Sequence, residues 1–595
     1  MAFEFLINSV ISAFFLLYSL ALGAAVLGYL PTFKLNNDST NNNYLKCFFY
    51  LSTGISIQIL ILMLLGFAGC LNKTFVGLLA AGLFPIALHR AKTCFTVFTN
   101  ASLSSITLVC VLFLLMLAFS WHPPGYWDDT SFHLPLARFY LEQEAIVLHE
   151  YLRFPLFPQN MNMLMVLGLM FGDTLTAQIF ATLPWFVIGV GLMGVCKWLN
   201  GSSVIGFLVA LVLVKYIGAF KVGFGYAYVD AGLALFCWSA LLALVLWYEQ
   251  YREKIPGSVA WILIAGFLGG AAAGTKLFGG VFAFILLVYI LFLTRTFRIG
   301  LLFGALVLSS GAWWYLRSYL ISGDPFHPVA AKYFGYYLWN EQDLLSQVSE
   351  QSLQTVEKNP LYFFSALKNA GVQLWILVFI GFCVKNLPPA IRLMQFIFIT
   401  YFSFWFFVTQ VERYLAPVIV LATFLACYTL YVLLLFLYQK LNLQRSNRNF
   451  SFLLNIVVAL WGVSIAAKEI GRSIVKWDDR LEGNQGYELF TKASTLRLEY
   501  GDRLVQVGFE NAAYFFSGIA IGDWFGVARY SRMTTCDNTG CQLLGEVEMK
   551  ELLLGFNSKM LAVSFERYPL FRPEDYSTQF NLVLQNSQGA LLVTK

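Results

Sequence analysis

The chain has 595 residues, of which 58% are hydrophobic and only 12% are charged. Soluble domains carry about 25% charged residues, so this composition excludes a cytosolic globular enzyme, a disordered chain and a conventional basic nucleic-acid binder. The net charge is +6, from 39 basic and 33 acidic residues. The apolar runs are long and continuous rather than alternating, which indicates an α-helical polytopic membrane protein and not a β-barrel.

Fourteen apolar runs are candidates for transmembrane helices, each of which needs roughly 20 residues to cross the hydrocarbon. The first run lacks a preceding basic segment, so we interpret it as an uncleaved span rather than a signal peptide. Because some runs are short, we expect about 11 to 14 transmembrane helices. In chain order the predicted spans are 8–30, 47–70, 75–91, 104–120, 176–196, 203–219, 227–248, 258–274, 277–294, 299–320, 370–384, 391–409, 414–437 and 451–467.

The charges of the connecting loops orient these spans. One set of alternate loops carries fourteen Lys and Arg residues against only Asp38, Glu249 and Glu253, and the positive-inside rule marks this set as cytoplasmic. The opposite, extracytoplasmic face then holds two long loops, 121–175 and 321–369, and the chain after residue 468. We expect the chemistry on that outer face.

The predicted domains are a transmembrane module over 1–468 and a small soluble α/β domain over 469–595. In the second domain, RLVQVGF and KMLAVSF are typical of buried strands, and FNLVLQNSQGALLV predicts two strands around a turn. KELLLGF suggests the end of a helix. The domain contains no GxGxxG or Walker loop, so we expect no bound nucleotide. Cys536 and Cys541 lie close in sequence, and a disulfide between them is left open.

The most informative stretch is the first outer loop, which begins WHPPGYWDDTSFHLPLARFY at Trp121. Asp128 and Asp129 follow the end of a span, and His133 shares a face with Asp129 if this segment is helical. Adjacent carboxylates repel, which raises the pKa of one of them unless a metal or another cation intervenes. The pair therefore suggests a general base or a divalent-metal site, with helix capping as the alternative for either residue alone.

Further ionisable residues occur at the outer ends of predicted spans. Such residues are costly in a membrane and are functional candidates by default, although snorkelling or a local ion pair explains any single one. Because they share one end of the bundle, we expect them to converge. Arginine and lysine together suit a phosphate, and carboxylates opposite them suit activation of a hydroxyl group or metal binding. The residues are Asp230, Lys276, Arg317, Asp324, Glu412 and Arg413, with Lys215 as a further cation.

Six segments, several of them around these residues, resemble in this order segments of multispanning glycosyltransferases of the GT-C superfamily. They are WDDTSFHLPLARFY, AYVDAGLALF, GTKLFGG, WYLRSYLISGDPFHP, ERYLAP and IGDWFGVARY. The likeness is greatest to bacterial members near the aminoarabinose transferase and protein O-mannosyltransferase branch, and it extends from about residue 120 to residue 530. The ordered set carries the resemblance, because each motif alone is weak.

The resemblance implies that the acids of the first outer loop lie beside the acceptor and that the basic residues of the later motifs lie near the donor phosphate. Residue chemistry and resemblance together predict the site. The predicted sets are Asp128, Asp129 and Asp230 for catalysis; Lys276, Arg317 and Arg413 for the donor phosphate; His133, Asn160, Asn162 and Glu412 for the acceptor or sugar; and Asp128, Asp129 and His133 for a metal.

Two positions depart from the family pattern. Many relatives carry an acid shortly after the FP dipeptide of the first outer loop, where this chain has Asn160 and Asn162. Asparagine can orient a sugar hydroxyl but cannot act as a base, which weakens the case for a metal site that requires an acid there. The tryptophan-tyrosine-arginine-asparagine motif also lacks its asparagine, since the chain reads WYLRS over 314–318.

We therefore expect an integral-membrane glycosyltransferase on the outer face of a bacterial inner membrane. It would transfer a sugar from a polyprenyl-phosphate donor to a hydroxyl of a lipid, glycan or protein acceptor of the cell envelope. A divalent cation (Mg, Mn or Zn) is an optional cofactor, and no nucleotide or nucleic acid is expected. Two alternatives stay open: a transporter or flippase of lipid-linked saccharides, whose ionisable groups should lie nearer the midplane, and a glycan polymerase or ligase.

Overall fold

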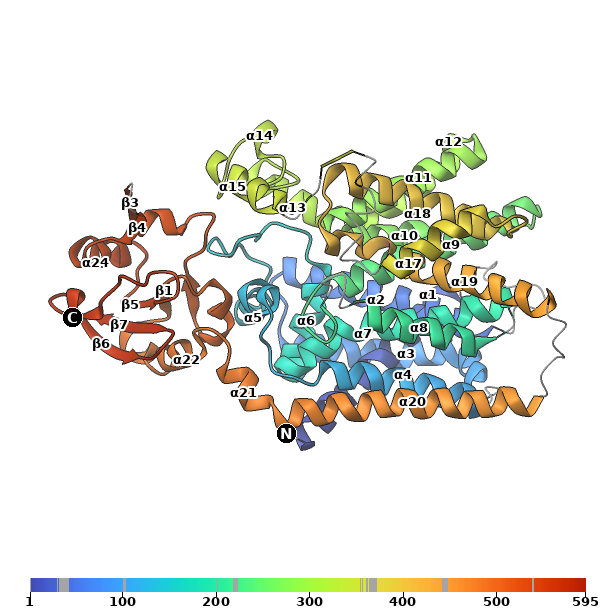
Figure 1. The fold of residues 1–595 in the computed structure, drawn as a ribbon, viewed down its shortest axis with the longest axis horizontal. Coiled ribbons are helices and arrows are strands. Elements are labelled where there is room, and N and C mark those ends of the chain that lie inside the picture. Colours follow the sequence, from blue (N-terminus) through green and yellow to red (C-terminus); the bar gives the residue numbers. More distant parts are fainter. Residues whose placement is uncertain are drawn as a thin grey trace. The chain divides into compact units, whose positions relative to one another are not determined.

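In the computed structural model the chain forms two compact units (Figure 1). The helical unit comprises Met1–Trp121, Pro158–Leu316 and Glu350–Arg472, and the sheet unit comprises His122–Phe157, Arg317–Ser349 and Ser473–Lys595. The sheet unit thus combines the C-terminal segment with parts of both predicted outer loops. The structure describes residues 2–28, 30, 42–99, 103–200, 202–217, 223–353, 355, 357–359, 362, 372–440, 448–537 and 540–595.

Each of the fourteen predicted spans overlaps a helix in the described part of the chain. The predicted span 299–320 corresponds to two helices, α12 and α13, which are bent by 62° relative to each other. The helices are α1 (Ala2–Leu27), α2 (Asn43–Phe67), α3 (Lys73–Thr99), α4 (Leu103–Ser120), α6 (Asn160–Phe171), α7 (Thr174–Asn200), α8 (Ser203–Ile217), α9 (Asp230–Arg252), α10 (Val259–Ala273), α11 (Leu277–Thr294), α12 (Phe297–Gly311), α13 (Trp313–Ser322), α17 (Val372–Cys383), α18 (Pro389–Val408), α19 (Ala416–Lys440) and α20 (Arg448–Val475).

The chain is a multi-pass membrane protein. Within the described residues, eight helices are long and apolar enough to cross a membrane, or nine if the bent pair α12 and α13 is one span. This number is lower than the 11 to 14 expected, partly because α8, α10 and α17 have only 15, 15 and 12 residues. The eight are α1, α2, α4, α7, α9, α11, α18, and α19 together with the short turn before it.

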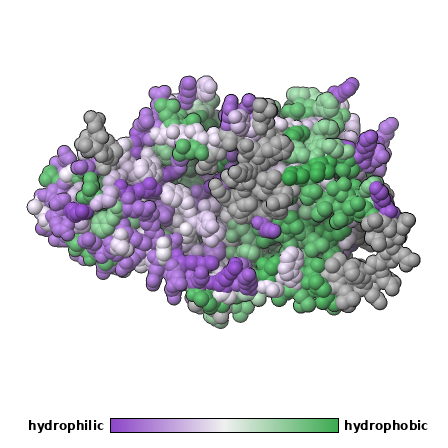
Figure 2. Space-filling model, in the orientation of Figure 1, coloured by the Kyte–Doolittle hydropathy of each residue, from purple (hydrophilic) through white to green (hydrophobic). Residues whose placement is uncertain are grey.

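The middle of the helical unit is formed by α7 and α9, which contact each other. Every residue of α9 from Asp230 to Trp247 is buried, and the most apolar part of α7 is buried throughout. A helix that is hydrophobic all round needs neighbours or lipid on every face. In contrast, α4 and α11 leave more than half of their residues unburied, and the visible surface of this unit is largely hydrophobic in Figure 2.

The sheet unit is built on five strands in the spatial order β2-β1-β5-β7-β6. β1 pairs in parallel with β2 and β5, whereas β7 pairs antiparallel with β5 and β6. The strands predicted from the sequence are therefore confirmed. They are β1 (Arg503–Val507), β5 (Met560–Ser564), β6 (Phe580–Gln585) and β7 (Gly589–Thr594). The sequence did not predict β2 (Ile519–Ile521) or a separate hairpin of β3 (Thr534–Asp537) and β4 (Gly540–Leu543).

Both faces of this sheet bear a helix. Val505 and Val507 lie in a buried cluster with residues of α24 (Glu546–Gly555), whereas Leu504 lies in a second cluster with residues of α22 (Tyr487–Thr495). This separation follows from the two-residue period of a strand, which sends neighbouring side chains to opposite faces. The small α/β fold expected for the C-terminal segment is therefore present.

The remaining elements of the sheet unit are short. The backbones of Cys536 and Cys541 are paired in the β3–β4 hairpin, but their side chains lie outside the described part of the chain, so the disulfide stays a prediction. The short elements are η2 (Asp129–His133), α5 (Leu134–Glu142), α14 (Ala331–Phe334), α15 (Glu341–Ser352), α21 (Trp477–Glu482), α23 (Arg497–Tyr500), η6 (Glu510–Phe515), η7 (Tyr530–Arg532) and η8 (Pro573–Tyr576).

Candidate functional site

A buried carboxylate in the helical unit holds two cations. Asp230 Oδ1 lies 2.8 Å from Lys276 Nζ, and Asp230 Oδ2 lies 3.0 Å from Arg413 Nη2. The Asp230 side chain is fully buried, while the side chains of Lys276 and Arg413 are 17% and 23% exposed. The acid is therefore inside the cluster, and both cations keep a part of their surface available to a ligand.

Each of these three residues lies where a helix begins. Asp230 is the first residue of α9, and Lys276 directly precedes α11 in extended backbone. Arg413 lies in η5 (Glu412–Leu415), the short 3₁₀ helix that leads into α19. The start of a helix has unsatisfied N–H groups and a partial positive charge. Since the three side chains touch, three such starts surround one cluster.

The electrostatics of the cluster favour an anion. One carboxylate and two cations give it a formal charge of +1, and the three helix starts add positive potential. The arginine fork and the lysine point charge are both suited to phosphate oxygens. The carboxylate also holds both cations in place, because it accepts one charge-assisted hydrogen bond from each.

Aromatic rings stabilise the same two cations. Lys276 Nζ lies 5.2 Å from the centre of the Tyr414 ring, and the Arg413 guanidinium lies 5.1 Å from the centre of the Tyr228 ring. Cation–π contacts of this length lower the energy of a charged group in apolar surroundings. Tyr228 belongs to the AYVDAG segment and Tyr414 to the ERYLAP segment, so both motifs supply a charge and a ring.

The break between α10 and α11 depends on small residues. A Cβ atom on Gly279 would lie 2.0 Å from the carbonyl oxygen of Ala272, so α11 can begin this close to α10 only with glycine there. Asn160 fixes the same break from α6, because its Nδ2 donates to the Ala271 carbonyl at 3.0 Å. Asn160 Oδ1 in turn accepts a 2.7 Å hydrogen bond from Trp314 Nε1.

The other predicted sugar-binding residues of the helical unit lie near these elements. Asn162 is buried in the first turn of α6, and Glu412 begins η5 directly before Arg413. The amide of Asn160 is used in internal hydrogen bonds on both its atoms. Its observed role is to hold the end of α10.

The acidic pair of the first outer loop belongs to the sheet unit. Asp128 is half-buried, while Asp129 and His133 are buried at the two ends of the π-helical turn η2. Neither carboxylate oxygen of Asp129 makes a hydrogen bond of normal geometry among the described residues. Burial and the nearby charge of Asp128 raise the pKa of Asp129 well above its usual range, although neighbouring backbone N–H groups oppose this.

Arg317 also belongs to the sheet unit, where it binds backbone of the first outer loop. Its Nη1 donates to the Pro155 carbonyl at 2.9 Å, and its Nη2 donates to the Val147 carbonyl at 3.1 Å. The guanidinium is buried. These bonds connect Arg317, which lies shortly before the second outer loop, to the first outer loop.

The described residues do not provide a three-ligand metal site. No group of three or more His, Cys, Asp or Glu side chains in the described part of the chain is placed to hold a metal ion. Asp128, Asp129 and His133 are not such a group in the described residues, and a metal bound by them stays a prediction.

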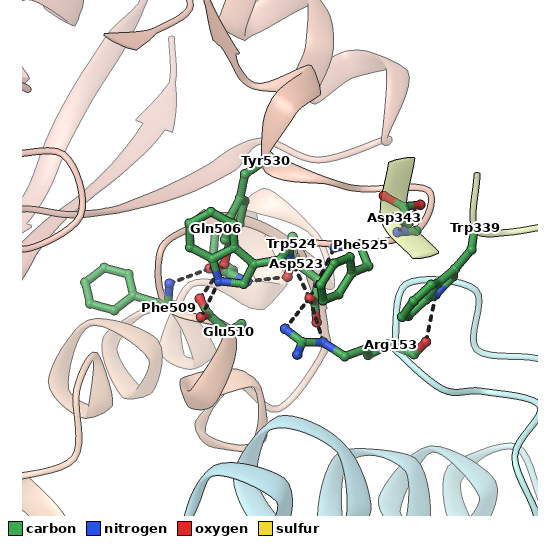
Figure 3. A network of polar contacts seen from close by, with 12 residues as sticks. Arg153, Trp339, Asp343, Gln506, Phe509, Glu510, Asp523, Trp524, Phe525 and Tyr530 are labelled. Carbon is green, nitrogen blue, oxygen red and sulfur yellow. Dashed lines mark hydrogen bonds and ion pairs between the residues drawn. The ribbon is translucent and has the colours of Figure 1, made fainter. Parts of the chain in front are cut away.

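Sequence reasoning did not predict a polar network in the sheet unit (Figure 3). Arg153 donates from Nε and Nη2 to Asp523 Oδ1, at 3.0 and 2.7 Å. Glu510 accepts hydrogen bonds from Trp524 Nε1 at 2.8 Å and from the Tyr530 hydroxyl at 2.7 Å. In the sequence, the IGDWFGVARY segment contributed only to the resemblance to GT-C glycosyltransferases. Its partner in the outer loop could not be read from the sequence.

Parts of this chain are similar in sequence to known proteins. A family described as SF2091/S2213 matches residues 476–593. The uncharacterized protein SF2093/S2215 of Shigella flexneri is 40% identical over 189 residues, which are 31% of this chain and 94% of that protein. The uncharacterized protein SF2091.1/S2213 of Shigella flexneri is 38% identical over 121 residues, which are 20% of this chain and all (100%) of that protein. The chain belongs to the family of these Shigella proteins.

Two solved structures are similar across most of the chain. They are crystal structures of ArnT from Cupriavidus metallidurans, in the apo state and bound to undecaprenyl phosphate. The TM-scores are 0.54 and 0.53 at 12% identity, over 82% of this chain and 97% of ArnT. This likeness shows the fold, so the GT-C fold expected from the sequence motifs is confirmed.

Proposed function

We propose that this protein is a membrane glycosyltransferase that moves a sugar from a polyprenyl-phosphate donor to a hydroxyl of a cell-envelope acceptor. The observation that carries the proposal is the Asp230–Lys276–Arg413 cluster at the starts of three helices. Its net positive charge suits a lipid phosphate. ArnT, which has the same fold, has been crystallised with undecaprenyl phosphate.

In the proposed reaction the acceptor hydroxyl attacks C1 of the sugar, and the bond between C1 and the phosphate oxygen breaks. Lys276 and Arg413 stabilise the charge that grows on the departing polyprenyl phosphate. Asp128 or Asp129 takes the proton of the acceptor hydroxyl. Asp230 keeps the two cations in position, because both of its oxygens are already engaged by them.

The location follows from the loop charges and belongs to the same proposal. A cytoplasmic set of basic loops leaves the cluster, the first outer loop and the sheet unit on the outer face of a bacterial inner membrane. A donor that arrives lipid-linked needs no nucleotide at the site. His133, Asn162 and Glu412 are proposed to line the acceptor or sugar site.

The test is sugar transfer by the purified full chain with a panel of labelled polyprenyl-phosphate sugars. Lys276→Met and Arg413→Met should each lower transfer by about 100-fold, because each removes one charge from the leaving phosphate. Lys254→Met, which removes an exposed lysine from a predicted cytoplasmic loop, is the matched control and should transfer normally.

Two results would contradict the proposal. Full transfer by both Asp128→Asn and Asp129→Asn would show that the outer-loop pair is not the base. Movement of labelled lipid-linked sugar across a vesicle membrane without any product would favour the flippase alternative.

A further inference from the structure

Six consecutive residues of the second outer loop, 332–337, are all exposed, and four of them are aromatic. We call these residues, KYFGYY, the aromatic loop. Tyr333 has 85% of its surface exposed. Isolated exposed apolar residues are ordinary, but a contiguous patch of large rings marks a surface that binds something.

The base of the aromatic loop is firmly held inside the sheet unit (Figure 3). Trp339 is buried, donates from Nε1 to the Arg153 carbonyl at 3.0 Å and stacks on Phe525 with ring centres 4.8 Å apart. Asp343 lies 3.0 Å from Arg529. We call Trp339 and Asp343 the stem of the loop. The rings of the loop are therefore exposed beside a stem that is held by hydrogen bonds, ring stacking and an ion pair.

The helix that precedes the loop is also apolar on its outside. In α13, Trp313, Leu316, Tyr319 and Leu320 are exposed, whereas Arg317 and Ser318 are buried. A helix on a water-facing surface has the opposite arrangement. Exposed apolar residues that continue along a helix with its polar residues inside are typical of contact with lipid.

The helix before α13 in the chain, α12, also has exposed apolar residues. α12 passes into α13 at the 62° bend, and Phe297, Leu301 and Leu308 of α12 are exposed on the helical unit. The exposed residues of α13 and of the aromatic loop include tryptophan and tyrosine. Tryptophan and tyrosine are enriched where a bilayer meets water, since their rings are apolar with one polar group.

We propose that α13 and the aromatic loop bind the surface of the bilayer at the level of the lipid headgroups. The rings of the loop lie among the headgroups, and the exposed Lys332 ammonium contacts lipid phosphates. The stem at Trp339 and Asp343 transmits this anchorage to the sheet unit. The proposal does not depend on the proposed glycosyltransferase activity.

The test is photocrosslinking of the full chain in phospholipid vesicles, with p-benzoylphenylalanine at single positions. Tyr333→p-benzoylphenylalanine should give lipid adducts at a yield close to that of Phe292, an exposed residue of α11, and about tenfold above that of Leu570, an equally exposed residue of the sheet unit. A yield at the level of Leu570, or adducts confined to this chain's own peptides, would overturn the proposal.

A second measurement separates a bilayer from a glycan acceptor as the partner. A fluorophore on Tyr333→Cys, in vesicles whose lipid headgroups carry nitroxide, should lose about half of its emission, since an interfacial segment lies at headgroup depth. The same fluorophore on Leu570→Cys should lose little. Equal quenching at both positions would overturn the proposal, as would protection of Tyr333→Cys by added acceptor glycan alone.

Discussion

At the residue scale, the protein keeps carboxyl groups in two opposite environments. Both oxygens of Asp230 are neutralised by cations, whereas those of Asp129 are buried without a normal hydrogen bond. Burial, followed by the charge of Asp128, therefore raises the pKa of Asp129. A carboxylate with a raised pKa is a stronger base, which suits removal of a hydroxyl proton, and its ionised form opposes folding.

Asp129→Asn should abolish transfer and raise thermal stability. In the wild type the neutral carboxyl is favoured by the fold. Its stabilising contribution is complete below the unfolded-state pKa of about 3.9 and is lost as pH rises through the raised folded-state pKa. The melting temperature of the variant should exceed that of the wild type at about pH 8, by a few degrees. Thermal unfolding should show this difference shrinking toward about pH 4, and a constant difference would contradict the assignment.

At the element scale, the site depends on a helix, α11, whose first residues lie very close to the backbone at the end of α10. α11 begins beside the end of α10, and this start places Lys276 within reach of Asp230. The approach is possible because Gly279 has no side chain to meet the Ala272 carbonyl. The two adjacent glycines of GTKLFGG, Gly279 and Gly280, are therefore expected to differ in how well they tolerate a larger side chain.

Gly279→Ala should destabilise the protein and reduce transfer, whereas Gly280→Ala should not. An added Cβ at Gly279 would lie 2.0 Å from a carbonyl oxygen, but at Gly280 the nearest atom is the Tyr315 hydroxyl at 3.6 Å, an ordinary contact. Overpacking costs about 1–3 kcal/mol. The comparison is made by melting temperature and transfer rate of the two purified variants. Equal behaviour of both would show that the helix start can shift without cost.

The sheet unit is held together by one segment that binds two others. The turn after β2 carries Asp523, which Arg153 of the first outer loop contacts, and Arg529, which pairs with Asp343 of α15. Since the acidic pair of the first outer loop belongs to the same unit, this turn is expected to restrict the movement of that loop.

Arg153→Met should release the first outer loop from the turn. The loss of two charge-assisted hydrogen bonds costs about 1.5–3 kcal/mol, and faster hydrogen exchange is expected in residues 147–155 and 520–530. Arg153→Lys should restore part of the protection, because lysine keeps the charge but not the two-pronged geometry. The exposed Arg480→Met is the matched control. Unchanged exchange in Arg153→Met would rule out this role.

At the scale of the whole molecule, the loop charges predict which face each unit occupies. In intact cells, Leu570→Cys on the sheet unit should react with a membrane-impermeant maleimide, and Lys254→Cys should react only after lysis. Both positions are exposed. The background should lack the exposed native cysteines Cys110 and Cys383. The reverse labelling pattern would invert the proposed orientation.

The amino-acid sequence alone predicted the class of the protein, the positions of its apolar helices and of four strands, and the residues of the Asp230 cluster. These are local properties: apolar runs predict helices in a membrane, alternating or short apolar runs predict strands, and ionisable residues within apolar segments stand out. For the same reason each of the fourteen predicted spans overlaps a helix in the described part of the chain, while the number that crosses a membrane depends on helix lengths that apolar composition does not define.

Which residues lie together is known from the fold alone. Asp230 meets Lys276 and Arg413 across 46 and 183 residues of chain, and Arg153 meets Asp523 across 370. Asn160 donates to the end of α10 across 111 residues, a contact that its place in the sequence did not predict. Contacts between residues so far apart depend on how helices and loops pack, and one chain without its fold contains no signal for that packing.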